Sequence, residues 1–517
     1  MRDRLPNFLF VMADQMVAPA LPVYGHPLVK APHIETLARQ GVVFDNAYCN
    51  APLCAPSRFS MLSGQLPSRI GAYDNAAEFP AATPTLPHYL RLMGYRTCTA
   101  GKMHFVGPDQ LHGFEERLTT DIYPADFDWT PDWKRPETRL TWYHDMLSVT
   151  QAGVCARSLQ IDFDDETAFR SVRRIYDFAR DDDARPFFLA VSFSHPHDPY
   201  TITREYWDRY DHDAIDPPRV APLPDAERDP HSRRLYRVTG MEAQTPTEAQ
   251  TRNARHAYYG AISYVDDRLG ELLHALDETG LAEDTVVIFT ADHGDMLGER
   301  GMWYKMTFFE WSARVPLIVH APARLAARRV AACVSLVDLL PTVLALAGDA
   351  APEPADALDG KSLVPLLEGG RGGQDDTVLG EYFAEGAVAP LFMIRRGIHK
   401  YVACEADPPQ LFDLTADPDE RDNLAERPEH AERLAAFAAE AEARWDPAAL
   451  GRAVTANQQR RRLVAEALGK GRRTSWDFRP RRDAAREYVR NYAVLGDIEQ
   501  RARLPRPSLS DERPGNN

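Results

Sequence analysis

Residues 52–64 read Pro52-Leu-Cys54-Ala-Pro56-Ser57-Arg58-Phe-Ser-Met-Leu-Ser63-Gly64 and contain the pattern C-x-P-x-R followed by Leu-Ser-Gly. The chain has six cysteines but no C-x-x-C pair, which argues against a thiolate zinc site. Six cysteines in 517 residues are also too few for a disulfide scaffold. We expect most of them to be buried structural thiols. Cys54, with constrained residue types around it, requires a different explanation.

Strand-like apolar runs alternate with helical stretches on both sides of this segment. The runs cover residues 8–12, 96–100, 187–193, 285–290 and 317–320, and helices are expected over residues 85–93, 165–180, 255–278 and 336–347. Continuous apolar runs are typical of parallel strands that are buried on both faces. The alternation therefore predicts an α/β sheet covered by helices.

Polar side chains follow the ends of four of these runs. They are Asp14, Lys102 with His104, His197, and Asp292 with His293. Open parallel sheets bind their ligands at the edge formed by the carboxyl ends of the strands. We therefore expect these side chains to meet in one site at that edge.

Composition divides the chain into three parts. Residues 1–375 are expected to form the catalytic domain, which ends in a stretch rich in Ala, Pro, Asp and Gly. Residues 376–450 contain short strand-like runs and a helical Ala/Glu/Arg-rich stretch, which predict a small α+β subdomain with an antiparallel sheet. Residues 451–517 are expected to form a basic tail.

The net charge of -16 is the sum of two parts of opposite sign. The tail has fifteen Arg and one Lys against eight acids, a net of +8, so residues 1–450 carry -24. An acidic body argues against nucleic acid as a partner. No apolar run approaches the roughly 18 residues of a membrane span, and the N-terminus lacks a signal-peptide pattern. We expect a cytoplasmic protein with neither a nucleic-acid nor a membrane partner.

The segment around Cys54 resembles the signature of type I sulfatases, in which this cysteine is oxidised to formylglycine. The resemblance implies an alkaline-phosphatase/sulfatase-like fold, with a central mixed sheet flanked by helices and a smaller C-terminal subdomain. A hydrated aldehyde offers two hydroxyls on one carbon. One attacks sulfur, and the other then expels sulfate, which a serine ester could not do. Arg58 would hold this diol through charge-assisted hydrogen bonds.

The same resemblance implies one divalent metal ion. Asp14, Cys54, Asp292 and His293 match the positions of its ligands. Many sulfatases have a second Asp after the first ligand and Asn at position 293, whereas this chain has Gln15 and His293. That departure resembles the branch of choline sulfatases and phosphonate monoester hydrolases. Oxygen ligands favour Ca²⁺, while an imidazole suits Mn²⁺, so both ions stay open.

Further catalytic residues are implied by likeness. Lys102 and His104 lie in Gly-Lys-Met-His and resemble the residues that bind a sulfate oxygen and deprotonate the second hydroxyl. His197 and Lys305 resemble the pair around the leaving-group oxygen, one of which would protonate the departing alkoxide. Cations around one dianion form the electrostatic clamp that such a transition state requires.

Longer segments resemble choline sulfatases in particular. They cover residues 63–69, 73–79, 101–127 and 380–386, and the Arg-rich tail with Trp476-Asp-Phe478. A trimethylammonium group is best held by aromatic faces and a carboxylate. The candidate substrate-binding residues are Trp129 as the main face, Tyr123, Asn75, His144, and Glu381 or Glu385, of which the resemblance slightly favours Glu381.

Two other functions stay open. One is a phosphonate monoester or phosphodiester hydrolase, or an arylsulfatase, of the same superfamily. The other is a non-catalytic protein that binds choline esters and keeps Cys54 unmodified. The expected partners are a small sulfate ester, a formylglycine-generating maturation enzyme, and further copies of the chain in a dimer or tetramer. The basic tail would wrap a neighbouring protomer and place Asp497 near its pocket.

Overall fold

A nine-stranded mixed sheet forms the centre of the computed structural model. The structure describes residues 5–348, 350–370 and 376–481, and eight single residues between 484 and 504. Along the sheet the order is β11 (Arg328–Ser335), β2 (Val42–Tyr48), β10 (Leu317–His320), β8 (Thr285–Ala291), β1 (Asn7–Asp14), β6 (Phe187–Pro196), β3 (Arg96–Gly101) and β4 (Glu116–Arg117), with β9 (Arg314–Val315) paired to β2. The predicted mixed α/β sheet is confirmed. Strands β2 and β11 have no counterpart among the predicted runs.

The middle of the sheet is parallel and fully buried. Strand β1 pairs in parallel with β6 and β8, and β3 pairs in parallel with β6. Every residue of β1, β3, β6 and β8 is buried, which explains their continuous apolar sequences. Strand β10 runs antiparallel to both of its neighbours, so this run does not belong to the parallel set.

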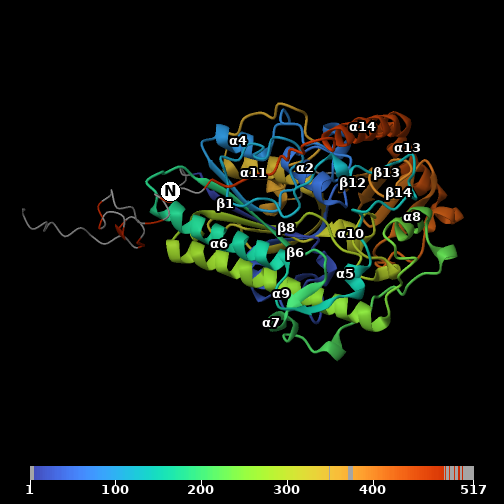
Figure 1. Cartoon of the computed structure of the whole chain (residues 1–517), viewed down its shortest axis with the longest axis horizontal. Coiled ribbons are helices and arrows are strands. Elements are labelled where there is room, and N and C mark those ends of the chain that lie inside the picture. Colours follow the sequence, from blue (N-terminus) through green and yellow to red (C-terminus); the bar gives the residue numbers. More distant parts are fainter. Residues whose placement is uncertain are drawn as a thin grey trace, which may run out of the picture.

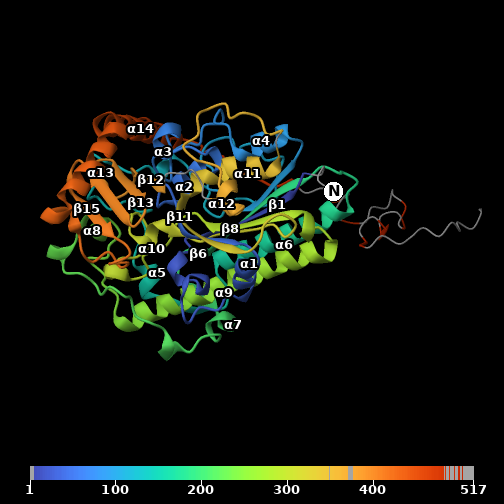
Figure 2. The same cartoon turned by 180° about the vertical axis from the view of Figure 1, so that it is seen from behind.

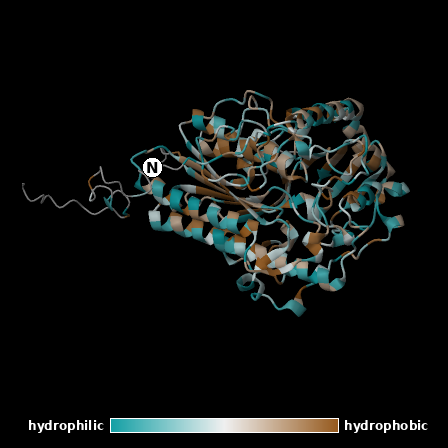
Figure 3. Cartoon of the chain, viewed as in Figure 1, coloured by the Kyte–Doolittle hydropathy of each residue, from teal (hydrophilic) through white to brown (hydrophobic). Residues whose placement is uncertain are grey.

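Helices cover both faces of the sheet (Figure 1 and, from behind, Figure 2). The long helices α6 (Leu159–Arg180) and α9 (Glu248–Thr279) pack on each other and on β6, with α1 (Pro32–Gln40) against α9. The opposite face carries α2 (Cys54–Ser63), α4 (Leu86–Leu92) and α11 (Leu339–Ala347). Figure 3 shows hydrophobic residues along the central strands and hydrophilic ones on the outer sides of α6 and α9. This amphipathic pattern is why the predicted helices dock on the sheet.

Shorter elements fill the surface around this frame. They are α3 (Pro67–Ile70), α5 (Leu147–Thr150), α7 (Arg204–Trp207), α8 (Pro230–Val238), α10 (Glu310–Ala313), α12 (Val364–Leu367) and the parallel pair β5 (Gly153–Cys155) and β7 (Thr201–Thr203). Helix α12 lies within the stretch rich in Ala, Pro, Asp and Gly that ends the expected catalytic domain.

The C-terminal part contains the predicted antiparallel sheet. Its strands are β12 (Thr377–Tyr382), β13 (Leu391–Arg396), β14 (His399–Cys404) and β15 (Asp407–Asp413), covered by α13 (Ala431–Arg444). The next helix, α14 (Pro447–Leu468), crosses the expected start of the tail at residue 451. Val454 on α14 is fully buried, so the first part of the expected tail is a helix that packs on its own chain.

Candidate active site

Four strands bring the predicted polar residues to one edge of the sheet. Asp14 ends β1, Lys102 follows β3, His197 follows β6, and Asp292 with His293 follows β8. Because these strands are mutually parallel, their carboxyl ends meet at the same edge. The predicted convergence of these residues follows from the order of strands in the sheet.

Cys54 is the first residue of α2 and lies buried among these side chains. Its Sγ is 3.2 Å from His293 Nε2, 3.5 Å from Lys102 Nζ and 4.0 Å from Asp14 Oδ1. Burial alone would raise the pKa of the Cys54 thiol, but the charges of Lys102, Lys305 and His293 lower it well below its usual value. The start of a helix adds a further preference for negative charge. An anion is therefore stable at this position.

Arg58 lies one turn further along α2 and is fully buried. It donates from Nε to Asp292 Oδ2 at 2.8 Å and from Nη2 to Asp14 Oδ2 at 2.9 Å. Its Nη1 donates to Ser192 Oγ at 2.8 Å and to the carbonyl of Lys102. The guanidinium thus holds the two carboxylates, whereas we had expected it to hold the nucleophile.

Lys102 and His104 approach Cys54 from the loop after β3. Gly101, which precedes them, has a φ of 92°, and a Cβ there would lie 1.9 Å from the carbonyl oxygen of Ser192. Lys102 Nζ contacts the carboxylate of Asp14 as well as Cys54. The backbone N–H of His104 donates to Asp121 at 2.8 Å, while neither of its ring nitrogens has a hydrogen-bond partner among the described residues. His104 is therefore fixed at its backbone, and its ring lies beside the Cys54 thiol, whose pKa it helps to lower.

His197 and Lys305 form the predicted pair on the other side of Cys54. His197 Nδ1 lies 2.7 Å from the carbonyl of Asp198, so Nδ1 carries a proton and Nε2 accepts from Lys305 Nζ at 2.9 Å. Lys305 Nζ also donates to Gln15 Oε1 at 2.6 Å. The Gln15 amide donates to Asp295 Oδ2 at 2.6 Å, so its oxygen faces Lys305.

Asp198 and Asp295 also contact the candidate site residues, through His144 and Gln15, and sequence reasoning missed both. Burial opposes ionisation of Asp198, but the neighbouring side chains of His144, His197 and Lys305 hold its pKa well below the usual value. Burial raises the pKa of Asp295 to about 6. The signal for both was local: Asp198 directly follows His197, and Asp295 lies three residues after Asp292 in Asp-His-Gly-Asp.

The four predicted metal ligands form one buried cluster. One donor atom from each of Asp14, Cys54, Asp292 and His293 lies within 4.8 Å of the others. Although burial and the Cys54 sulfur raise it, the cations Lys102 and Arg58 lower the pKa of Asp14 to about 2. Two carboxylates and an imidazole directed to one point are a donor set that suits a divalent ion.

Aromatic rings line the space beside His104. The Trp129 ring stacks on Trp142 at 6.1 Å between centroids and meets the His104 ring edge-on at 5.9 Å. Tyr123 lies 6.5 Å from Trp129 and 5.6 Å from His197, and Lys102 Nζ sits over its ring at 4.7 Å. Trp129 and Tyr123 are half-buried. The structure thus brings the two predicted aromatic residues next to His104 and His197.

His144 and Asn75 also reach the site. His144 Nδ1 lies 3.3 Å from Asp198 Oδ2, and its ring stacks on Tyr304 at 4.3 Å. Asn75 Oδ1 accepts the backbone N–H of Ala55 at 3.0 Å, so this side chain orients the first turn of α2. Asp497 lies outside the described residues.

The two candidate glutamates differ. Glu381 accepts hydrogen bonds from Ser68 N–H (2.7 Å), Ser68 Oγ (2.8 Å) and Trp445 Nε1 (2.7 Å), so its carboxylate is saturated by the scaffold. Glu385 is buried and lies close enough to feel the charges of Lys305 and Cys54. Because the scaffold already occupies the Glu381 carboxylate, the geometry favours Glu385 over Glu381 as the candidate counter-charge, and both roles stay predictions.

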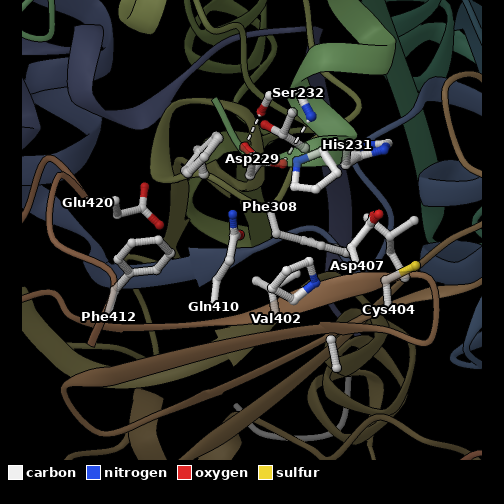
Figure 4. Close-up of a pocket in the computed structure, with 16 residues that line it drawn as sticks. Asp229, His231, Ser232, Phe308, Val402, Cys404, Asp407, Gln410, Phe412 and Glu420 are labelled. Atoms are coloured by element: carbon white, nitrogen blue, oxygen red, sulfur yellow. Dashed lines mark hydrogen bonds between the residues drawn. The ribbon is translucent and has the colours of Figure 1, made fainter. Parts of the chain in front are cut away.

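A separate cavity of about 30 Å³ lies between α8 and the antiparallel sheet (Figure 4). It is lined by residues that include Asp229, His231, Asp407, Gln410 and Glu420. None of the predicted site residues is among the described residues that line it. With room for about one water molecule, it does not compete with the Cys54 site for a substrate.

Comparison with known proteins agrees with this geometry. The family model described as sulfatase matches residues 6–349. The choline-sulfatase of Rhizobium meliloti (strain 1021) is 46% identical over 508 residues, 97% of this chain and 99% of that protein. The chain belongs to the sulfatase family. It is therefore a sulfuric ester hydrolase. Models described as choline sulfatase enzyme C terminal and N-sulphoglucosamine sulphohydrolase, C-terminal, match residues 452–504 and 298–444.

More distant relatives show how widely this sulfatase fold is shared. Arylsulfatase K of Xenopus laevis is 30% identical over 447 residues, 81% of this chain and 79% of that protein. The crystal structure of the phosphonate monoester hydrolase of Agrobacterium radiobacter superposes with a TM-score of 0.69 at 26% identity, over 85% of this chain and 95% of that one. None of the helices that the structure describes combines the length and apolar character needed to cross a membrane.

Proposed function

We propose that this sulfatase hydrolyses choline-O-sulfate to choline and inorganic sulfate. The observation that carries the proposal is that two aromatic rings and one carboxyl lie near the charged groups around Cys54. The ring of Trp129 meets His104, that of Tyr123 lies under Lys102, and the buried Glu385 interacts with the charge of Lys305. Aromatic faces and an acid suit a trimethylammonium group, which cannot donate conventional hydrogen bonds. The identity to the choline-sulfatase of Rhizobium meliloti supports the same substrate.

We propose that Asp14, Asp292, His293 and the modified Cys54 hold one divalent ion, Mn²⁺ or Ca²⁺. When bound, the ion supplies positive charge to the sulfate oxygens and to the nucleophile. Formylglycine at position 54 supplies, as its hydrate, one hydroxyl to attack sulfur and a second to release sulfate. The buried donor set and the stability of an anion at this position fit both groups. Arg58 orients the two carboxylates through its paired contacts with Asp14 and Asp292.

The protein's own residues then bind the substrate and move protons. Lys102 neutralises a sulfate oxygen beside the nucleophile. His104, with a fixed backbone and a ring beside Cys54, accepts the proton that releases sulfate. Lys305 and His197 share one proton along their 2.9 Å contact and deliver it to the departing choline oxygen. Gln15 holds Lys305 in place for this transfer.

Trp129→Ala is expected to lower kcat/KM for choline-O-sulfate by about 10- to 30-fold, because a desolvated cation–π contact contributes close to about 2 kcal/mol, which corresponds to about 30-fold. A small aryl sulfate, which carries no cation, should lose less than about threefold. Phe127→Leu is the control, since Phe127 lies on the same short helix but packs on Trp476. Steady-state kinetics with both substrates test this, and equal losses on both would contradict the cation site.

Glu385→Gln and Glu381→Gln form a matched pair, because burial raises the pKa of both carboxyls to about 7. The Glu385 carboxyl gains its negative charge as the pH rises through about 7, so KM for choline-O-sulfate should fall between about pH 6 and pH 8. Glu385→Gln should raise KM at pH 8 by about tenfold and abolish this pH dependence. Glu381→Gln should leave both unchanged. A KM that stays constant with pH in the unmodified protein would contradict the role of Glu385.

We also propose two partners. The first is a maturation enzyme that oxidises Cys54 to formylglycine. Mass spectrometry of the peptide that contains Cys54 tests this modification. An intact thiol after co-expression with that enzyme would contradict formylglycine. Further copies of the chain form a dimer or tetramer through the basic tail from residue 451 on. One side of α14 packs on its own chain, while Leu463 and Val464 on this helix are exposed. We further propose that the protein acts in the cytoplasm.

A further inference from the structure

One arginine of helix α14 contacts two walls of the active site. Arg461 is 5% exposed and donates from Nη1 and Nη2 to the two carboxylate oxygens of Asp74, each at 2.7 Å. Its Nη1 also donates to Thr130 Oγ1 at 3.1 Å, and its Nε donates to Asn457 Oδ1 at 2.6 Å. A bidentate pair of this kind fixes direction as well as distance. The guanidinium therefore defines where Asp74 and Thr130 lie relative to each other.

Asp74 leads directly to the nucleophile. It is fully buried, and its Oδ1 also accepts the backbone N–H of Ala76 at 3.0 Å, which shapes the turn around Asn75. Asn75 in turn accepts the backbone N–H of Ala55, the residue after Cys54. A shift of Asp74 would therefore move the amide that orients the first turn of α2.

Thr130 leads to the aromatic wall. It directly follows Trp129, and its Oγ1 donates to the carbonyl of Phe127 at 2.7 Å, which closes the short helix that carries Trp129. Helix α14 holds the next residues too: Arg462 pairs with Asp132, and Gln458 Oε1 accepts the backbone N–H of Trp133 at 3.0 Å. The segment after Trp129 is thus tied to α14 at several successive positions.

We propose that Arg461 is a positioning residue that holds the Asp74–Asn75 turn and the Trp129 segment in one geometry, which makes α14 part of the active-site architecture. It acts through Asn75 on the nucleophile and through Thr130 on Trp129, and it contacts neither the metal ligands nor the catalytic pair. The effect of Arg461 on Trp129 rests on the proposed cation site. Its effect on the nucleophile through Asn75 does not.

Arg461→Gln removes the bidentate contact and keeps a polar side chain of similar length. We expect kcat to fall with both choline-O-sulfate and an aryl sulfate, and KM to rise only for choline-O-sulfate, with a total loss in kcat/KM of about 100-fold. Asp74→Asn should reproduce the fall in kcat, and Thr130→Val the rise in KM. Arg461→Lys should recover part of the activity. Arg452→Gln, which changes an exposed arginine of the same helix, should have no effect.

The proposal is overturned if Arg461→Gln folds and leaves kcat and KM for both substrates within about twofold. If Arg461→Gln does not fold, Asp74→Asn and Thr130→Val carry the test, and kinetic constants unchanged in both would overturn it. The experiments also distinguish an error in the proposed cation site from an error in the role of Arg461. If the cation site alone is wrong, Trp129→Ala would affect both substrates equally, while Arg461→Gln and Asp74→Asn would still lower kcat.

Discussion

Cys54→Ala is expected to abolish turnover of choline-O-sulfate, with a loss in kcat of at least about 10⁴-fold. Cys54 lies among Lys102, His293 and Asp14, and no other cysteine of the described chain lies in the cluster of metal donors. The substitution removes the group that becomes the nucleophile but leaves the surrounding charges in place. Sulfate release measured at saturating substrate, together with a thermal unfolding curve, separates loss of chemistry from loss of fold.

Two further cysteine variants sharpen this prediction. Cys98→Ala is the control, because Cys98 is a buried residue of strand β3 and burial raises the pKa of its thiol to about 12. It should retain activity within about twofold. Cys54→Ser offers one hydroxyl, so it should release at most one equivalent of choline and no sulfate. Continuous sulfate release by Cys54→Ala or Cys54→Ser would contradict the proposed chemistry.

Asp14→Asn is expected to reduce bound divalent metal from one equivalent to below about a tenth, and kcat by about 10³-fold. Asp14 supplies one of the two carboxylates of the donor cluster and also neutralises Arg58 and Lys102. Its replacement therefore removes a ligand and leaves two buried cations with less compensation. Elemental analysis of the purified protein and kinetics in added Mn²⁺ or Ca²⁺ measure the two effects.

Asp267→Asn is the matched control for metal binding. Asp267 belongs to a second group of potential donors with His33 and Asp266, but its carboxylate pairs with Arg209. We expect this variant to keep its metal and its activity. Full metal content in Asp14→Asn, or loss of metal in Asp267→Asn, would contradict the assignment of the metal to the Cys54 site.

The sequence was sufficient to predict the residues that end the central strands. Asp14, His197 and Asp292 follow buried apolar runs, and parallel pairing of β1, β6 and β8 brings such positions together without further information. The motif around Cys54 likewise lies within one helix, so its members are neighbours by chain connectivity. For these residues, local pattern and topology were enough.

Contacts between distant segments could not be predicted in this way. The choice between Glu381 and Glu385 depends on whether Ser68 and Trp445 occupy the carboxylate, which only packing decides. The pair of Arg461 and Asp74 joins positions 387 residues apart. A basic composition suggested a tail that binds another subunit, whereas the charge of Arg461 is used within its own chain. Amino-acid composition shows how much charge a segment carries, but not which residues that charge pairs with.

The most direct test of the central claim is a comparison of sulfate release from choline-O-sulfate and from an aryl sulfate, alongside hydrolysis of a phosphonate monoester, by the mature protein. We predict that kcat/KM is highest for choline-O-sulfate by at least about 100-fold and that Trp129→Ala narrows the gap by about 10- to 30-fold. A phosphonate ester or aryl sulfate turned over as efficiently as choline-O-sulfate would contradict the proposed substrate.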